Sequence, residues 1–156
     1  MGRRLTQAAL LLIVVFAVAQ FVRPERANPA TDPSRAIQAH VGTPRELVAI
    51  LNRSCADCHS NDTVWSSWYT QLAPLSWLMA HEVAAGRKAM NFSDWAMYTP
   101  EQQRMLLIVS CDDAKSGKMP GPYPYFKPET RLSPKDVQTI CAAASEGDLH
   151  AAGASR

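Results

Sequence analysis

The sequence predicts a small, mostly α-helical domain of three to five short helices behind an apolar N-terminal helix. Three observations predict this fold class. A proline-containing helix-start pattern occurs three times, and each copy is followed by apolar residues at helical spacing. No stretch shows the strict alternation of polar and apolar residues that is typical of a half-buried strand. With 156 residues, the chain has room for one compact domain and little more.

The first element, residues 1–22, is typical of an export signal or a membrane anchor. Two arginines precede an uncharged apolar run, and Leu5 to Val22 is 18 residues, about the lower limit for crossing a bilayer. Ala17-Val18-Ala19 resembles a cleavage site, but we favour an uncleaved anchor because the apolar run continues beyond it. Basic residues tend to stay on the cytoplasmic side, so the rest of the chain is expected outside the cytoplasm.

The next segment, residues 23–42, contains three prolines and little apolar periodicity. It is typical of a tether that lifts a domain off a membrane. We expect residues 43–147 to form the domain and residues 148–156 to be a flexible C-terminal tail. The chain has 16 Lys and Arg against 14 Asp and Glu, and two of the arginines belong to the N-terminal segment. No basic stripe remains, so no nucleic-acid partner is expected.

The helices of the domain are predicted from their start signals. A Ser or Thr hydroxyl can cap the first turn, proline suits the first helical position, and a later Glu, Gln or Asp can reach back to the cap. The three copies begin at Thr43, Thr99 and Ser133. The apolar residues that follow them are Leu47, Ile50 and Leu51; Met105, Ile108 and Val109; and Val137, Ile140, Cys141 and Ala144. A fourth helix is expected from Pro74 to about Ala89.

The motif Cys55-Ala-Asp-Cys58-His59 contains the residues with the clearest potential for binding a metal or a cofactor. A zinc site needs a second pair of ligands at similar spacing, and the other two cysteines are isolated, so we expect no zinc. A redox dithiol usually follows a strand, and no strand precedes this motif. Cys-x-x-Cys-His is also the attachment signature of c-type haem. On a helical turn the three side chains share one face, so both thiols can bond the porphyrin while His59 binds iron from below.

A second axial ligand is expected in the segment 116–132, which has four prolines and is predicted to be a stiff loop. Met119 lies in this loop and is followed by proline. Its alternative role is to fill the core from the loop. His81 is the rival ligand, although a role beside a haem propionate suits it better. The other methionines lie in or near predicted helices, where core packing is the simpler interpretation.

These motifs resemble small monohaem cytochromes c and, more closely, the bacterial "haem-binding domain" family of short, N-terminally anchored proteins. The resemblance spans about residues 20–146. It rests on "CADCHSNDTVW", on "LAPLSWLMAHEVAAGRKAMNFSDW" and on the weaker "QFVRPERANP" and "KMP". It implies one haem c held covalently by Cys55 and Cys58, with His59 as axial ligand. It also implies that the haem surroundings include His81, Arg87, Asn91 and Trp95.

The expected function is electron transfer at the outer face of the cytoplasmic membrane, or in the periplasm if the signal is cleaved. With His59 and Met119 on iron, no position is open for substrate, so we expect an electron carrier with unidentified redox partners rather than an enzyme. Methionine ligation raises the reduction potential, and we expect burial by Trp65, Trp68, Trp77 and Trp95 to raise it further. The alternative is a haem-based sensor with a displaceable or absent distal ligand.

Cys111 and Cys141 are predicted to form a disulfide. The compartment is oxidising, and the motif cysteines are committed to haem, which leaves this one pair. The bridge would close a loop of about 30 residues around Met119 and stabilise the fold by roughly 3 to 4 kcal/mol. The alternative is two buried free thiols on apolar helix faces.

Overall fold

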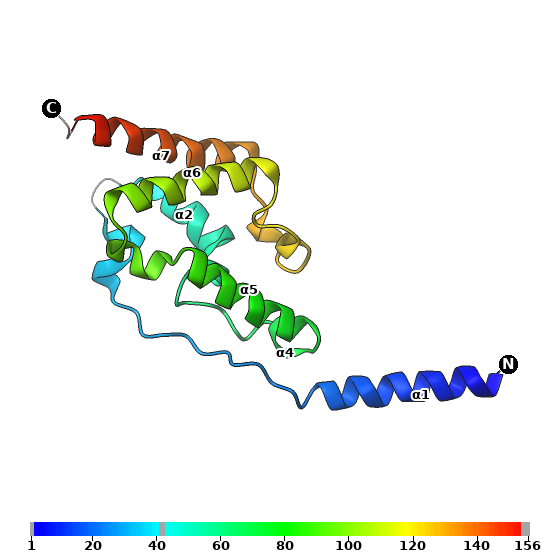
Figure 1. Ribbon diagram of the computed structural model, residues 1–156. Helices are drawn as coiled ribbons and strands as arrows, with labels where there is room; N and C mark the ends of the chain where they lie inside the picture. Colours follow the sequence, from blue (N-terminus) through cyan, green and yellow to red (C-terminus); the bar gives the residue numbers. More distant parts are fainter. Residues whose placement is uncertain (1, 41–42, 154–156) are drawn as a thin grey trace.

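The computed structural model describes residues 2–40 and 43–153, with side chains up to residue 145. It is mostly helical, and the described residues contain no strand, as expected (Figure 1). The α-helices are α1 (Gly2–Ala19), α2 (Arg45–Ser54), α3 (Ala56–His59), α4 (Trp68–Gln71), α5 (Leu75–Ala89), α6 (Pro100–Ser116) and α7 (Pro134–Gly153). The 3₁₀ helices are η1 (Pro33–Arg35), η2 (Ile37–Ala39), η3 (Phe92–Met97), η4 (Tyr123–Tyr125) and η5 (Pro128–Thr130).

Helix α1 projects away from the rest of the molecule (Figure 1). Its 18 residues have a mean hydropathy of 1.6, and none of them is buried, so the helix is long and apolar enough to cross a membrane. A signal sequence has the same properties. The helix ends at Ala19, before the apolar run itself ends at Val22.

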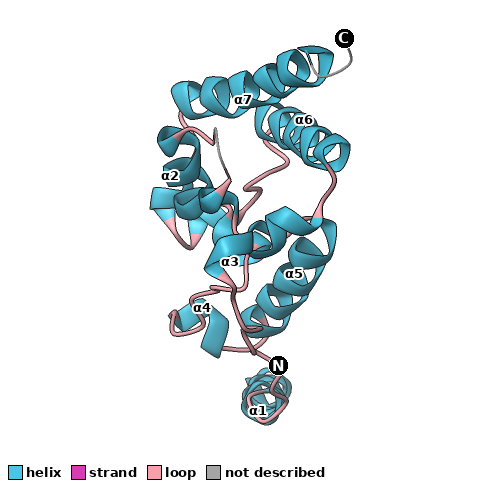
Figure 2. Ribbon diagram, turned by 90° about the vertical axis from the view of Figure 1, so that its left-hand side faces the viewer, coloured by secondary structure: helices cyan, strands magenta, loops and turns pink. Residues whose placement is uncertain are grey.

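The domain has two ends joined by α2 and α3 (Figure 2). Helices α6 and α7 pack side by side at one end, and α4 and α5 lie at the other. The main core lies where α2 and η3 meet the α6–α7 pair. It contains Ile37, Leu47, Ile50, Leu51, Phe92, Trp95, Cys111, Ile140, Ala143 and Ala144.

Two of the three predicted helix starts have the expected geometry. The hydroxyl of Thr99 accepts a hydrogen bond from Gln102 N, and the Gln102 side chain accepts one from Thr99 N, which completes a capping box. Ser133 and Asp136 make the same pair of bonds at the start of α7. The first start is displaced, because α2 begins at Arg45 and Pro44 occupies the cap position instead of the first helical position.

The apolar residues that indicated α6 do not all face the core. Met105 and Val109 are each 48% exposed, whereas Cys111 is buried, and Leu107, Ile108 and Ala114 pack against the core. The apolar residues of α6 surround most of the helix, so spacing alone does not show which side meets the core.

The segment expected as a tether packs against the domain over much of its length. Ile37 is buried in the core, and Asn28 donates from Nδ2 to Thr63 O at 3.0 Å and accepts from Trp65 Nε1 at 2.9 Å. Arg26 donates to Thr70 O at 2.9 Å. These contacts explain why a proline-rich segment follows one path along the domain. Residues 41–42 of the expected tether lie outside the described residues.

A disulfide joins Cys111 on α6 to Cys141 on α7, which confirms the predicted pairing. The Cα atoms are 4.8 Å apart, and 30 positions of sequence separate the two residues. The bridge fixes α6 to α7 on both sides of the intervening loop. Helix α7 continues to Gly153, past the expected start of a tail at residue 148, and the last three residues of that tail lie outside the described residues.

Candidate haem site

An apolar cavity of about 470 Å³ lies between α3, α5, α6 and the loop 117–132. Its volume is within the range of small-molecule and cofactor sites. Cys55, Cys58 and His59 line one side, and Met119 lines the cavity from the loop. The cavity therefore brings together the motif and the loop methionine that the sequence singled out, although 60 positions separate His59 from Met119.

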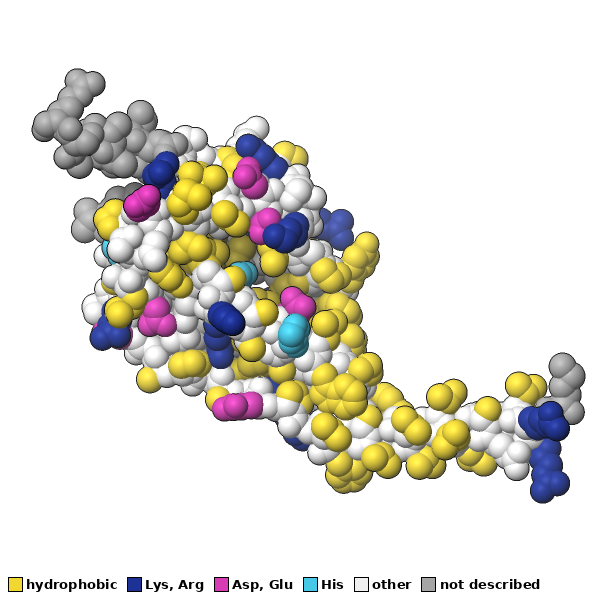
Figure 3. Space-filling model, in the orientation of Figure 1, with side chains coloured by type: hydrophobic (Ala, Val, Ile, Leu, Met, Phe, Trp, Pro, Cys, Tyr) yellow, Lys and Arg dark blue, Asp and Glu magenta, His cyan; other side chains and the backbone are white. Residues whose placement is uncertain are grey.

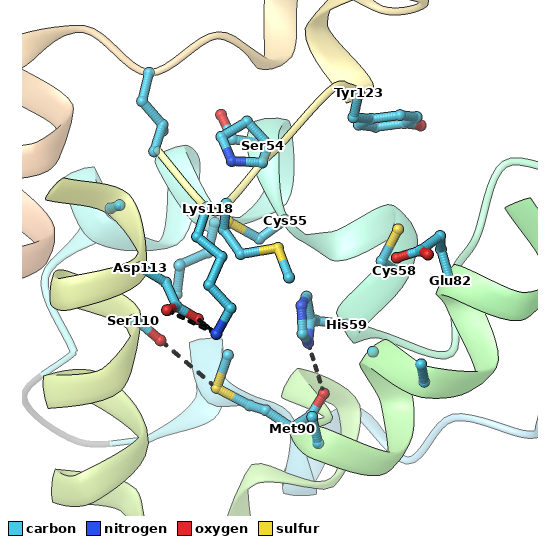
Figure 4. A pocket seen from close by; sticks show the side chains of 18 of the residues that line it. Ser54, Cys55, Cys58, His59, Glu82, Met90, Ser110, Asp113, Lys118 and Tyr123 are labelled. Carbon is cyan, nitrogen blue, oxygen red and sulfur yellow. Dashed lines mark hydrogen bonds and ion pairs between the residues drawn. The ribbon is translucent and has the colours of Figure 1, made fainter. Parts of the chain in front are cut away.

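The chain turns sharply at the motif, which places its side chains in the cavity. Helix α2 ends at Ser54, Cys55 has non-helical backbone angles, and the four-residue helix α3 follows. His59 N donates to Cys55 O at 3.0 Å, which closes the turn that carries all three side chains. Figure 4 shows Cys55, Cys58 and His59 around one space that Met90, Asp113 and Lys118 face from other elements.

His59 is oriented for metal binding. Its Nδ1 lies 3.1 Å from Met90 O (Figure 4). A carbonyl can only accept, so Nδ1 carries the proton and Nε2 is left with a free lone pair. Burial lowers the pKa of His59, so the ring is neutral at pH 7. A neutral imidazole held by a carbonyl at its other nitrogen is the usual form of a histidine ligand.

The surroundings of the two motif cysteines favour the protonated thiol. Burial raises the pKa of Cys55 and of Cys58 to about 12. Redox-active dithiols have a lowered thiol pKa, because the thiolate is the reactive species. The environment of Cys55 and Cys58 therefore argues against a redox dithiol and is compatible with thiols that are to be alkylated.

The motif helix packs very closely on α5 at Gly86. A Cβ at this position would lie 2.4 Å from Cys58 O and 3.1 Å from Cys58 Cβ. No side chain fits there without movement of the backbone. Because glycine has no side chain, α5 can pack directly against the backbone of α3. This contact fixes the position of the motif and makes α5 one wall of the cavity.

A carboxylate within the motif holds the opposite loop. Asp57 Oδ2 accepts a hydrogen bond from Tyr123 Oη at 2.5 Å and pairs with Lys127 Nζ at 2.7 Å. Asp57 Oδ1 also accepts from Val64 N at 3.2 Å, and the Asp57 side chain is only 12% exposed. Burial and the hydrogen bond to Asp57 raise the pKa of Tyr123, so the phenol keeps its proton. The loop that carries Met119 is thus bonded directly to the turn that carries the cysteines.

Charged groups also reach the cavity from α6 and the loop. Lys118 Nζ lies 3.0 Å from Asp113 Oδ1, and both residues line the cavity (Figure 4). Glu82 lines it from α5. The lining is otherwise largely apolar, which suits a flat apolar ring with polar groups at one edge.

His81, the expected rival ligand, is not in this cavity. It is exposed on α5 and lines a separate groove with Val22, Arg23 and Trp77. The residues of α5 that face the cavity include Leu78, Glu82, Ala85 and Ala89. His81 is one position from Glu82, so its side chain is rotated by roughly 100° around the helix axis, away from the cavity. The structure brings Met119, and not His81, together with His59.

Arg87, Asn91 and Trp95 support the site from outside the cavity. Arg87 donates to Ser60 O and Thr63 Oγ1, and also to Ala27 O and Asn28 Oδ1, each at 2.8 or 2.9 Å. Asn91 Nδ2 donates to Asn61 Oδ1 at 2.9 Å. Trp95 is buried in the core.

The expected shell of four tryptophans is also absent from the cavity. Among the described residues that line it there is no tryptophan. Trp68 is 60% exposed and Trp77 is 38% exposed, both at the α4–α5 end of the domain. The four tryptophans led us to expect aromatic side chains around the haem. Which way each indole faces depends on how the helices pack, and the sequence does not show this.

Several residues of the site were not identified from the sequence. Met79 and Met90, which also line the cavity, were assigned to core packing. Asp57 is at one of the two x positions of Cys-x-x-Cys-His, where any residue is allowed. The motif therefore gave no reason to assign Asp57 a role. Gly86, a lone glycine inside a predicted helix, was the one recognisable signal, because such a residue often marks a close approach.

A family model described as "Haem-binding domain" matches residues 14–146, most of the chain. The chain belongs to this family. No curated protein and no solved structure matches it. Membership of the haem-binding domain family agrees with the resemblance found in the sequence and supports haem as the cofactor. The matched range includes the end of α1 and the segment that packs along the domain, as well as the cavity.

Proposed function

We propose that this haem-binding domain is a monohaem c-type cytochrome that transfers electrons at the outer face of the bacterial cytoplasmic membrane. The observation that carries the proposal is the convergence of Cys55, Cys58, His59 and Met119 on one apolar cavity. Two thiols three residues apart, a neutral imidazole and a thioether are the donor set of a covalently attached haem. Helix α1 serves as an uncleaved anchor and keeps the domain outside the cytoplasm.

Each of these residues has a defined role. Cys55 and Cys58 would hold the haem through thioether bonds, and His59 Nε2 would bind its iron while Met90 O holds Nδ1. Met119 would supply the second protein ligand to iron. Haem supplies one-electron chemistry at iron when it is bound. The apolar walls from α5 and α6 exclude water, which together with a methionine ligand favours the reduced state.

Covalent attachment is tested first. Protein matured in a host that attaches haem c should keep its colour after denaturation and acid–acetone extraction. Cys55→Ala combined with Cys58→Ala should yield no holoprotein. Haem that extracts freely from the wild-type protein would show that the attachment is not covalent.

The distal ligand is tested by comparing methionines of the same cavity. Met119→Leu should abolish the methionine-to-iron charge-transfer band, lower the reduction potential and admit carbon monoxide. Met90→Leu, which retains the apolar volume at another of the three cavity methionines, should leave the band intact. His81→Ala should also leave it intact, because His81 faces another groove. Loss of the band only in Met90→Leu would move the ligand assignment to Met90.

A haem-based sensor is the second candidate function. It is favoured by the position of Met119 on a loop that lines the cavity, outside the α-helices. A ligand there can be displaced by a small molecule without repacking of the core. Rapid carbon monoxide binding to the reduced wild-type protein would favour the sensor, and a spectrum unchanged by carbon monoxide would favour the electron carrier.

A further inference from the structure

The C-terminal end of α1 is bonded to the α4–α5 end of the domain. Gln20 Oε1 accepts from Ala73 N at 3.0 Å, and Gln20 Nε2 donates to Ala73 O at 3.4 Å. Trp77 Nε1 donates to Val22 O at 2.8 Å. Arg23 donates to Gln71 O at 3.3 Å. The chain leaves α1 in contact with the domain, so no free spacer separates the two at this point.

The same end of the domain exposes large apolar side chains. We call them the α4–α5 patch, and their exposed fractions range from 38% to 85%. The patch consists of Phe21, Val22, Trp68, Leu72, Trp77 and Leu78. Figure 3 shows apolar side chains gathered where α1 joins the domain and continuing along α1. A surface of this kind on a soluble protein usually marks a contact with a partner or a membrane.

The length of α1 places this patch at the membrane surface. Eighteen helical residues span about 27 Å, close to the roughly 30 Å of a bilayer's hydrocarbon core. The residues that follow α1 directly are then at the level of the lipid headgroups. Tryptophan is enriched at this level, because its ring is apolar and its N–H can still form a hydrogen bond. Arg23 and Arg26 lie at the same junction and suit the phosphates there.

We propose that the α4–α5 patch is a membrane-contact surface that lies in the headgroup region of the bilayer crossed by α1. This inference rests on the proposed role of α1 as an uncleaved anchor. It replaces the picture of a domain lifted away on a tether. Leu78 belongs to the patch and also lines the haem cavity, so the cavity is held beside the membrane surface at a fixed height.

The test uses full-length holoprotein in phosphatidylcholine nanodiscs. A single cysteine is introduced by Leu72→Cys, or separately by Trp68→Cys, and carries a nitroxide spin label. The native cysteines do not compete in the proposed holoprotein, because Cys111 and Cys141 form the disulfide and Cys55 and Cys58 would be bonded to haem. Met97→Cys is the matched control: Met97 is an exposed apolar residue, 65% accessible, in η3 and outside the patch.

Relaxation of the label by oxygen and by a water-soluble nickel complex reports its depth. We expect oxygen to dominate at Leu72 and Trp68, with an oxygen-to-nickel ratio at least three times that at Met97. Equal ratios at all three positions would overturn the proposal. Alkaline carbonate extraction separates this failure from failure of the anchor. Release of the chain would overturn both, whereas a retained chain with aqueous labels would overturn the membrane contact alone.

Discussion

Replacing Gly86 by alanine should weaken the contact between α5 and the motif Cys55–His59. The new methyl carbon would lie 2.4 Å from Cys58 O, whereas ordinary contacts begin at 3.4 Å, so the two elements must separate by about 1 Å. The nearest atoms belong to backbone and Cβ, and no flexible side chain can move aside. Overpacking of this kind costs about 1–3 kcal/mol. Alanine in a helix interior regains about 0.8–1.0 kcal/mol relative to glycine.

The expected net loss is about 0 to 2 kcal/mol, which lowers Tm by up to roughly 8 °C. Thermal unfolding of the holoprotein, followed by circular dichroism, measures this change. The yield of covalent haem should also fall, because Cys58 moves with the turn. Ala84→Gly, at an exposed position on the same helix, is the control and should lose about 1 kcal/mol through helix propensity alone, with normal haem content. A Gly86→Ala protein more stable than wild type would refute the close approach of α5 and α3.

Three further changes have effects set by single contacts. Cys111→Ser combined with Cys141→Ser should reduce the free energy of unfolding, measured by chemical denaturation, by roughly 3 to 4 kcal/mol, which is the loop-closure value for 30 residues. Thiol titration of the unreduced wild-type holoprotein should find no free thiol. Asp57→Asn should lower the free energy of unfolding by about 1.5–3 kcal/mol, because its charge-assisted hydrogen bonds are weakened. It should also increase carbon monoxide binding, because the Met119 loop is held less firmly. Asp57→Glu should recover part of the stability and part of the resistance to carbon monoxide. Ser133→Ala should lower stability by about 1 kcal/mol and leave the haem spectrum unchanged, so a spectral change would show that α7 influences the site.

The sequence predicted best those features that depend on local chemistry. Two capping boxes, the span of α5 and the motif with its three side chains are fixed by residues a few positions apart. The disulfide was also predictable, because the compartment and the committed motif cysteines left one pair.

Features that depend on how helices are rotated against each other were not predictable. His81 was assigned to the haem surroundings, yet it is one residue away from the face of α5 that meets the cavity. Trp68 and Trp77 were expected around haem and instead lie at the end near α1. Because α5 has apolar residues on several sides, its periodicity is weak, and its packing against α3 and α4 selects the buried face.

The disulfide between α6 and α7 has a consequence for biosynthesis. If the domain is exported and carries haem c as proposed, all four cysteines reach an oxidising environment, yet Cys55 and Cys58 must stay reduced until haem is attached. Four cysteines can pair in three ways, and a bond from either motif cysteine to the α6–α7 pair would block maturation. In an N-terminus-first chain, the motif emerges before Cys111 and well before Cys141. In that case the cell must oxidise Cys111 and Cys141 and leave Cys55 and Cys58 reduced within one polypeptide. Until Cys141 emerges, Cys55 and Cys58 are the only intramolecular partners with which Cys111 can form a disulfide.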